Sequence, residues 1–254
     1  MQRHARTLIV VAGIALFAAQ SAAAQGREWT DRGYININGA FQGATIDLND
    51  ATDIRQYGED GRITENGSVD AGNLFDIGAG VRVWQNVSIG MGYSRGSSTS
   101  SVTVAGAVPH PLFFGQPRQF SENVGGLKHT EQAVHLQIGY MYVLSDAVDI
   151  QFFVGPSIFK LKQDVVSDVL IGEAGSPFTN IVAQPQTASR NESAVGVNVG
   201  LDVTYTAWRQ DDFKLGFGGF VRYAGASTDI RVLANDVSVD LGGFQAGVGA
   251  RVRF

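Results

Sequence analysis

The 254-residue chain contains no cysteine and only six prolines, and after its first 24 residues it has no run of 18 apolar residues. The missing cysteines do not decide the compartment, because oxidising and reducing compartments both hold cysteine-free proteins. Without a long apolar run, we expect no transmembrane helix in the mature chain. Acidic residues outnumber basic ones by 24 to 19, so the chain lacks the basic surface of a nucleic-acid-binding protein.

Motifs of common catalytic centres are also scarce. The sequence has no His/Cys cluster at metal-ligand spacing and no phosphate-binding glycine loop. His129 and Glu131 share the face of His135, which alternation places inward, whereas an enzyme that modifies lipid would need its His–Ser pair on the outer wall. We therefore predict no enzymatic activity, no metal site and no cofactor.

The N-terminal residues have the features of an export signal. Two arginines precede an apolar run from Leu8 to Ala19, which is too short for a helix that crosses a ~30 Å hydrocarbon core. Ala22 and Ala24 supply the small residues that a signal peptidase requires. We predict a cleaved signal peptide over residues 1–24, export to the periplasm, and one domain over residues 25–254.

Alternation of polar and apolar residues is the dominant pattern of the remaining chain. Between Val195 and Tyr205 every odd position is apolar and every even position is polar or glycine, and the segment from Phe244 to Phe254 alternates in the same way. A period of two is typical of strands with two different faces. Charged residues share one face with glycines, and the strands are long enough to cross a hydrocarbon core. The pattern favours a membrane barrel over a soluble β-sandwich.

We predict an all-β fold, a closed antiparallel transmembrane β-barrel of eight strands with short periplasmic turns and long extracellular loops. The expected strands cover residues 33–46, 72–84, 86–103, 128–144, 148–163, 192–207, 212–229 and 238–254. Long loops are expected over residues 47–71, 104–127 and 164–191. A ten-stranded barrel remains an alternative if the first or third long loop contains a further hairpin.

The chain resembles the eight-stranded outer-membrane barrel family that includes the OmpA transmembrane domain, the opacity proteins and the Ail/OmpX-type proteins. The resemblance rests on the glycine-rich alternating strands, the contrast of short turns and long loops, and the ending from Gly247 to Phe254. It implies an outer-membrane location, contact with lipid and lipopolysaccharide, and recognition of Phe254 by the barrel-assembly machinery. Family membership does not fix an activity, and we expect a monomer.

Alternation places a set of charged side chains inside the barrel. Side chains fill an eight-stranded barrel, and buried charges need partners. We predict that Asp76 and Asp202 pair with some of Arg82, Lys214 and Arg222, in a polar interior that leaves no open pore. The predicted network consists of Asp76, Arg82, Asp202, Lys214, Arg222 and Arg251.

Pro156 is a candidate lateral gate, because proline cannot donate a ladder hydrogen bond and the wall is weaker beside it. The alternative is a tolerated bulge or kink.

Two of the long loops carry apolar residues that could contact a partner. Leu112, Phe113 and Phe114 lie between prolines in the second loop, and Phe178 lies in the third. Exposed apolar patches often mark contact surfaces, although these residues could instead pack together over the barrel mouth. The acidic first loop is expected to be solvated and flexible.

We predict a non-enzymatic outer-membrane barrel with an envelope-structural or surface-contact (adhesion-like) role, its extracellular partner unknown. The alternative is a narrow channel or a lateral route for small hydrophobic or ionic solutes.

Overall fold

A computed structural model describes residues 27–43, 46–69 and 72–254, so the predicted signal peptide lies outside the described residues. The described chain forms eleven strands in one sheet: β1 (Gly33–Gly43), β2 (Ile46–Asp47), β3 (Asp50–Gln56), β4 (Glu59–Val69), β5 (Gly72–Trp84), β6 (Val87–Val108), β7 (Arg118–Val143), β8 (Val148–Glu173), β9 (Ile181–Gln210), β10 (Phe213–Val232) and β11 (Asn235–Arg253). No helix among these residues is long and apolar enough to cross a membrane.

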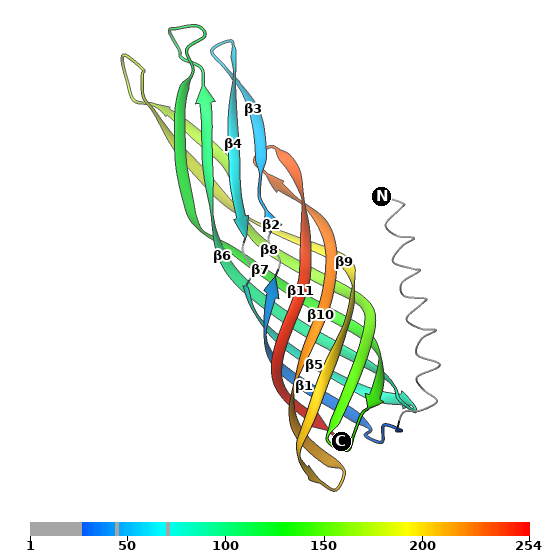
Figure 1. Cartoon of the computed structure of the whole chain (residues 1–254). Helices are drawn as coiled ribbons and strands as arrows, with labels where there is room; N and C mark the ends of the chain where they lie inside the picture. The colour runs from blue at the N-terminus through cyan, green and yellow to red at the C-terminus, as the bar shows by residue number, and fades with distance from the viewer. Residues whose placement is uncertain (1–26, 44–45, 70–71) are drawn as a thin grey trace.

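Eight of the strands close into a ring. β1 pairs antiparallel with β5, the chain of neighbours runs on through β6, β7, β8, β9 and β10, and β11 pairs back with β1. Short turns join the strands at the end where the C-terminus lies, and long hairpins extend from the other end (Figure 1). The prediction of a closed eight-stranded barrel is confirmed. We call the short-turn end periplasmic and the hairpin end extracellular.

Charged residues lie inside the lower part of the barrel and apolar residues lie outside it. Arg222, Asp202 and Arg251 are buried, whereas the outward residues of the same strands are exposed. A lipid-facing band has this inverted distribution. Its members include Ile35, Ile37, Phe75, Ile77, Val81, Ile89, Met91, Leu136, Ile138, Phe152, Val154, Val195, Val197, Val199, Phe217, Tyr223, Phe244 and Val248.

The extracellular ends of the strands are longer than predicted. The segments 104–127 and 164–191 were expected to be loops, but β6 continues to Val108, β7 begins at Arg118, β8 continues to Glu173 and β9 begins at Ile181. The predicted bounds of these two loops were therefore wrong: the long connections at this end are mostly strand, and only short segments without strand remain at the tips. Backbone hydrogen bonding stiffens these extensions because ladder pairs continue almost to the tips.

The first long loop is also largely strand. β3 and β4 form a hairpin, and β4 pairs with the upper part of β6 from Arg62↔Ala107 to Ser68↔Ser101. The expectation that these residues form a loop was therefore wrong. The hairpin lies outside the closed ring, so it adds strands to the extracellular sheet without enlarging the barrel to ten strands.

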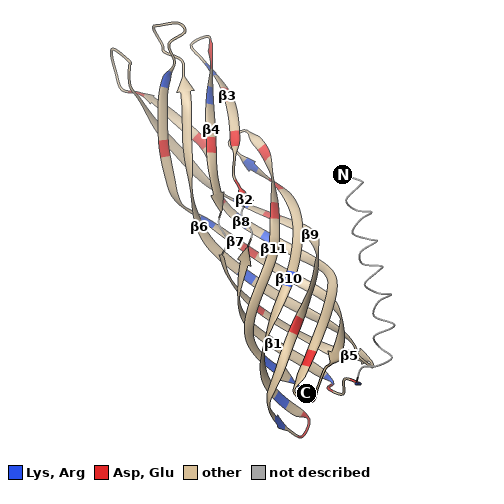
Figure 2. Ribbon diagram, in the orientation of Figure 1, with Lys and Arg blue, Asp and Glu red and all other residues tan. Residues whose placement is uncertain are grey.

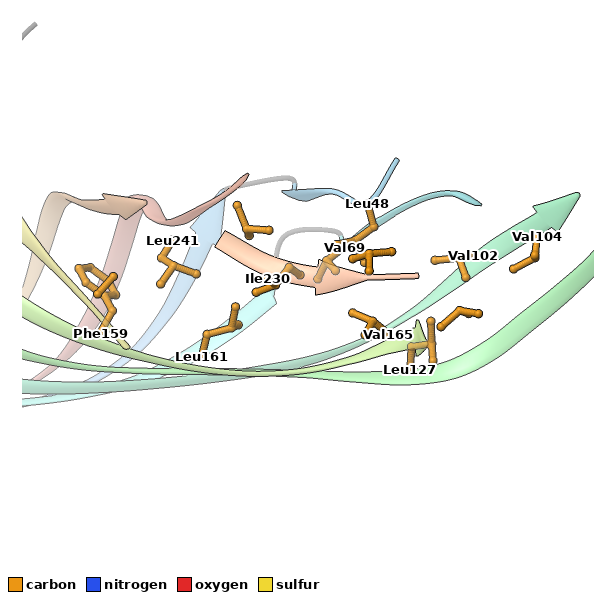
Figure 3. Close-up of a cluster of buried hydrophobic side chains, with 14 of the residues drawn as sticks. Leu48, Val69, Val102, Val104, Leu127, Phe159, Leu161, Val165, Ile230 and Leu241 are labelled. Carbon is orange, nitrogen blue, oxygen red and sulfur yellow. The ribbon is translucent and has the colours of Figure 1, made fainter. Parts of the chain in front are cut away.

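An apolar core fills the space between the extracellular extensions (Figure 3). The change of chemistry is clearest on β8. At the level of the lipid band, Ser157 points inward and Ile158 outward, whereas one step further Phe159 is buried and Lys160 is exposed. The extracellular half is thus built like a water-soluble barrel. Labelled members of the core are Leu48, Val69, Val102, Val104, Leu127, Phe159, Leu161, Val165, Ile230 and Leu241.

Candidate functional site

A network of buried polar side chains crosses the interior of the lower barrel. Arg222 on β10 forms an ion pair with Asp76 on β5 at 2.8 Å, and its Nε donates to Gln245 Oε1 at 2.7 Å. Asn38 Nδ2 donates to the other carboxylate oxygen of Asp76 at 2.9 Å. One of the predicted pairs, Asp76 with Arg222, is therefore present, and it links two strands that are separated in the ring by β1 and β11.

Asp202 pairs with Arg251 instead of the three bases predicted for it. The two side chains make two hydrogen bonds, Nε to Oδ1 at 3.0 Å and Nη2 to Oδ2 at 2.5 Å. They come from β9 and β11, which are separated by β10. Gly218 on β10 makes room between them, since a Cβ there would lie 3.1 Å from Arg251 Nε.

Arg82 and Lys214 do not bind the predicted acids. Lys214 Nζ lies 2.6 Å from Asp31 Oδ1, and Arg82 Nη1 donates to the carbonyl oxygen of Trp29 at 2.8 Å. Both bases therefore hold the segment that precedes β1. The sequence prediction did not place this segment, and for that reason missed the partners.

Trp29 is buried at the periplasmic end of the barrel. Its side chain is 2% exposed and packs with Tyr34 and Met141. Its indole N–H donates to Asp31 Oδ2 at 3.0 Å, and its backbone N–H donates to Asn86 Oδ1 at 3.0 Å. Alternation did not reveal Trp29, because this residue precedes the first strand.

Small cavities of about 30 Å³ lie within the wall and the network of the described residues. Such a volume holds roughly one or two water molecules. The upper cavity is lined by Ser98, His129 and Glu131, among others. Glu131 accepts the backbone N–H of Gly242 at 3.2 Å, and Gly242 has a positive φ of 85°.

A buried Ser–His contact lies on β6 and β7 and was missed in the sequence. Residues 92–96 read Gly-Tyr-Ser-Arg-Gly, which matches the Gly-x-Ser-x-Gly motif of a nucleophile elbow. Here the segment is an extended strand rather than a strand-to-helix turn. Ser94 Oγ lies 3.0 Å from His135 Nε2, and Ser157 Oγ lies 2.8 Å from His135 Nδ1. A second serine occupies the position where an orienting acid would be needed, so the contact is that of a packed polar core.

Pro156 lies on the outer face of β8 at an interruption of the β7–β8 ladder. Pairing stops between His135↔Ser157 and Ile138↔Val154. The side-chain amide of Asn198 covers this interruption from within, with Nδ2 3.2 Å from the carbonyl oxygen of Pro156 and 2.9 Å from Ser157 Oγ. The wall therefore has a weak point that is filled from inside.

Arg118 fastens the extracellular tips together. It is 6% exposed, it forms an ion pair with Glu173 at the end of β8, and it donates to the carbonyl oxygens of Pro109 and Phe178 at 2.8 and 3.0 Å. The Tyr57 hydroxyl donates to Glu173 Oε1 at 3.0 Å. Hydrogen bonding to Arg118 holds the pKa of the Glu173 carboxyl below its usual range. The β3–β4, β6–β7 and β8–β9 tips are thus joined at one point, which we call the tip clamp.

The residues predicted for surface contact divide into two groups. Leu112, Phe113 and Phe114 are 63%, 52% and 85% exposed at the apex of the β6–β7 loop. Phe178 is half-buried and supplies its carbonyl oxygen to the tip clamp. At the other end of the molecule, the carbonyl oxygen of Phe254 accepts the backbone N–H of Gly33 at 2.8 Å, which ties the end of the chain to the start of β1.

No protein-family model and no curated protein matches the chain. Among solved structures, the chain is similar to the outer membrane protein OprG from Pseudomonas aeruginosa, with 12% identity over 88% of this chain and 97% of that chain and a TM-score of 0.44. Neisserial surface protein A gives 16% identity, 87% and 97% coverage and a TM-score of 0.37. Ail, the attachment invasion locus protein of Yersinia pestis, gives 9% identity, 88% and 99% coverage and a TM-score of 0.38. The paired ring and the outward apolar band decide the fold: the chain is a closed, eight-stranded transmembrane β-barrel.

Proposed function

We propose that this chain is an outer-membrane protein whose barrel is a closed anchor and whose clamped extracellular tip contacts an external partner. The observation that carries the proposal is the exposure of Leu112, Phe113 and Phe114 on an apex that Arg118 holds in place. Three adjacent apolar side chains are costly to expose to water. Their position on a stiff projection, far from the lipid band, supports a role in contact.

The side chains that fill the barrel interior support the proposal that the barrel is a closed anchor. Trp29 is packed inside the periplasmic end, the ion pairs of Asp76 and Asp202 lie at the level of the lipid band, and the apolar core fills the extracellular half. These three layers leave little room for a water-filled path. We assign the barrel no catalytic role.

Replacing Leu112, Phe113 and Phe114 together by serine tests the contact role. Bacteria that display the chain should be retained on a layer of cultured epithelial cells or of other bacteria, and the triple variant should be retained several-fold less. Gln116→Ala in the same loop is the matched control. Heat-modifiable gel mobility must be the same in all three proteins, which shows that the barrel has folded. Equal retention of the triple variant would end the contact proposal.

A lateral route for small hydrophobic solutes is the second candidate, and the interrupted ladder beside Pro156 is the observation in its favour. If this wall opens, Pro156→Ala should slow uptake of a hydrophobic dye by restoring a ladder donor, and Asn198→Ala should accelerate it. Unchanged uptake in both variants would remove this candidate. Steady single-channel steps in a planar bilayer would favour transport over the closed anchor.

A further inference from the structure

The outer face of β6, β7 and β8 carries a group of basic and amide side chains directly above the lipid band. Arg95 on β6 lies opposite Gln132 on β7, and Gln132 lies opposite Lys160 on β8, so the three residues share one face of the sheet. Lys162 follows on the same face, two residues above Lys160. We call these four residues the basic patch. We propose that the basic patch binds the phosphorylated headgroup of a lipid in the extracellular leaflet. This inference goes beyond the contact role of the tips and does not depend on it.

The three basic side chains of the patch are available to an anionic ligand. Arg95, Lys160 and Lys162 are exposed, and none of them forms an ion pair with another described residue. Asp164 is the next acid above them on β8, and its carboxylate oxygens already accept the backbone N–H of Lys128 at 3.2 Å and the hydroxyl of Ser189. Guanidinium and ammonium groups bind phosphate oxygens through charge-assisted hydrogen bonds.

The spacing of the patch suits one headgroup. Neighbouring strands lie ~4.8 Å apart, so Arg95 and Lys160 stand about 10 Å apart on either side of Gln132, and Lys162 lies about 7 Å further along β8. The Tyr93 hydroxyl donates to Gln132 Oε1 at 3.3 Å, which leaves the amide N–H groups of Gln132 to donate elsewhere. Long basic side chains can therefore converge from two strands on the oxygens of one ligand.

The apolar wall beneath the patch selects a lipid over a soluble anion. Ile158 and Val134, which are 49% and 36% exposed, lie two residues below Lys160 and Gln132 on the same outward face. Two residues correspond to about 7 Å along a strand, or about 5 Å of height at a tilt of ~45°. The patch thus begins where the hydrocarbon ends. A ligand that contacts both surfaces has an anionic headgroup above and acyl chains below.

Charge of the opposite sign lies above the lipid band on the β10–β11 side of the barrel. Asp229 on β10 and Asp240 on β11 are the first exposed charged residues above Tyr223 and Phe244, which belong to the lipid band. Figure 2 shows acidic residues, in red, on the upper part of β11. Carboxylates repel a phosphate group. The headgroup therefore binds on the β6–β8 side and not around the whole circumference.

Binding of lipid A, a glycolipid that carries two phosphates, tests the inference. The full-length mature chain in detergent micelles is mixed with lipid A, and native mass spectrometry measures the bound fraction and hence an apparent Kd. Each Lys or Arg near an anionic lipid surface raises the affinity about fivefold, so removal of three should weaken binding about a hundredfold. The test variant combines Arg95→Gln, Lys160→Gln and Lys162→Gln.

A matched control removes the same charge elsewhere. Exposed arginines on β3, β4 and β10 are replaced together, as Arg55→Gln, Arg62→Gln and Arg231→Gln. This control should bind lipid A like the unaltered chain, and heat-modifiable gel mobility must show that all three proteins are folded. Equal affinity of the test variant and the unaltered chain would overturn the inference.

Two further ligands separate a lipid from free phosphate. Lipid A without its phosphates should bind the unaltered chain about a hundredfold more weakly than lipid A does, because it offers the basic patch no charge. Inorganic phosphate should not displace lipid A, because it has no acyl chains to contact the wall. Displacement by inorganic phosphate would mean that the patch is a site for the free anion, and would overturn the inference.

A fluorophore on a single cysteine reports the side of the barrel at which the lipid binds. The chain has no cysteine, so Ser97→Cys on β6 and Ser227→Cys on β10 each provide one labelling position, and both residues are exposed. Lipid A with a quencher on its headgroup should quench the fluorophore at position 97 several-fold more than the fluorophore at position 227. Equal quenching at the two positions would contradict a one-sided site.

Discussion

Raising the pH should loosen the β3–β4 hairpin, because this hairpin buries a carboxyl group without a hydrogen-bond partner. Glu65 on β4 is fully buried, and neither of its carboxyl oxygens has a partner among the described residues. Asp50 lies directly opposite on β3 and Val104 directly opposite on β6. Asp50 also keeps one buried oxygen without a partner. The free-energy cost of burying Glu65 is small only while its carboxyl group is protonated.

The magnitude follows from the proton affinity. Burial, and secondly the nearby Asp50 carboxylate, raise the pKa of Glu65 from 4.5 to about 7. Below pH 4.5 the group is protonated in the closed and open hairpin alike, so the hairpin keeps its full stability. Between 4.5 and about 7 the open form releases the proton first, and stability falls as the pH rises. Above about pH 7 the loss is complete, at most about 3 kcal/mol, or about a hundredfold in the opening constant.

Amide hydrogen exchange of peptides from β3 and β4 measures this loss, expressed as protection relative to the intrinsic rate at each pH. Protection should fall between pH 5 and pH 8, whereas peptides from the lower part of β9 should show no such fall. Glu65→Gln should remove the pH dependence, and Glu65→Leu should raise protection most at high pH. Glu122→Gln, at an exposed position on β7, should behave like the unaltered chain. A pH dependence that survives in Glu65→Gln would refute this reasoning.

Three further predictions concern the tip clamp, the interior network and the periplasmic mouth. Arg118→Met removes the base of Glu173 and the donor to two carbonyl oxygens, and should destabilise the tips by about 1–2 kcal/mol because Glu173 keeps contact with water, seen as faster proteolysis of residues 174–180 with the barrel intact. Asp202→Leu should lower the unfolding free energy in detergent micelles by about 3–5 kcal/mol, because it leaves the buried charge of Arg251 without its acidic partner. Adding Arg251→Met should restore most of the lost free energy. Trp29→Ala should leave planar bilayers silent, since the apolar core still fills the other end, and steady current steps would contradict that.

The eight wall strands could be predicted because both faces of each strand carry a signal. Where the outward face no longer meets lipid, only the inward half of the pattern remains. On β6 the inward residues Val102, Val104 and Val108 continue the alternation, but the residues between them resemble a loop. The lengths of the extracellular strands were missed for this reason. An apolar residue at every second position, without regard to its neighbours, would have indicated them.

The partners inside the barrel were harder to predict than the inward set itself. Which inward side chains pair with each other depends on the register of the strands and on whether the residues between them are small. Arg251 reaches Asp202 past Gly218 on β10, where a Cβ would lie 3.1 Å from Arg251 Nε. Lys214 is bound by Asp31, which precedes the first strand and has no alternating pattern. Neither fact is encoded in the residue types alone.

On β8 the inward residues change from polar to apolar and the outward residues from apolar to charged, and this change also fixes how deep the barrel lies in the membrane. If the barrel sank by two residues, Lys160 would enter the hydrocarbon, and if it rose by two, Ile158 would stand in water. Two residues correspond to about 7 Å along a strand, and a tilt of ~45° reduces this to about 5 Å of height. The molecule is therefore held at one level in its membrane, and the height at which it presents its tips is set by its own strands.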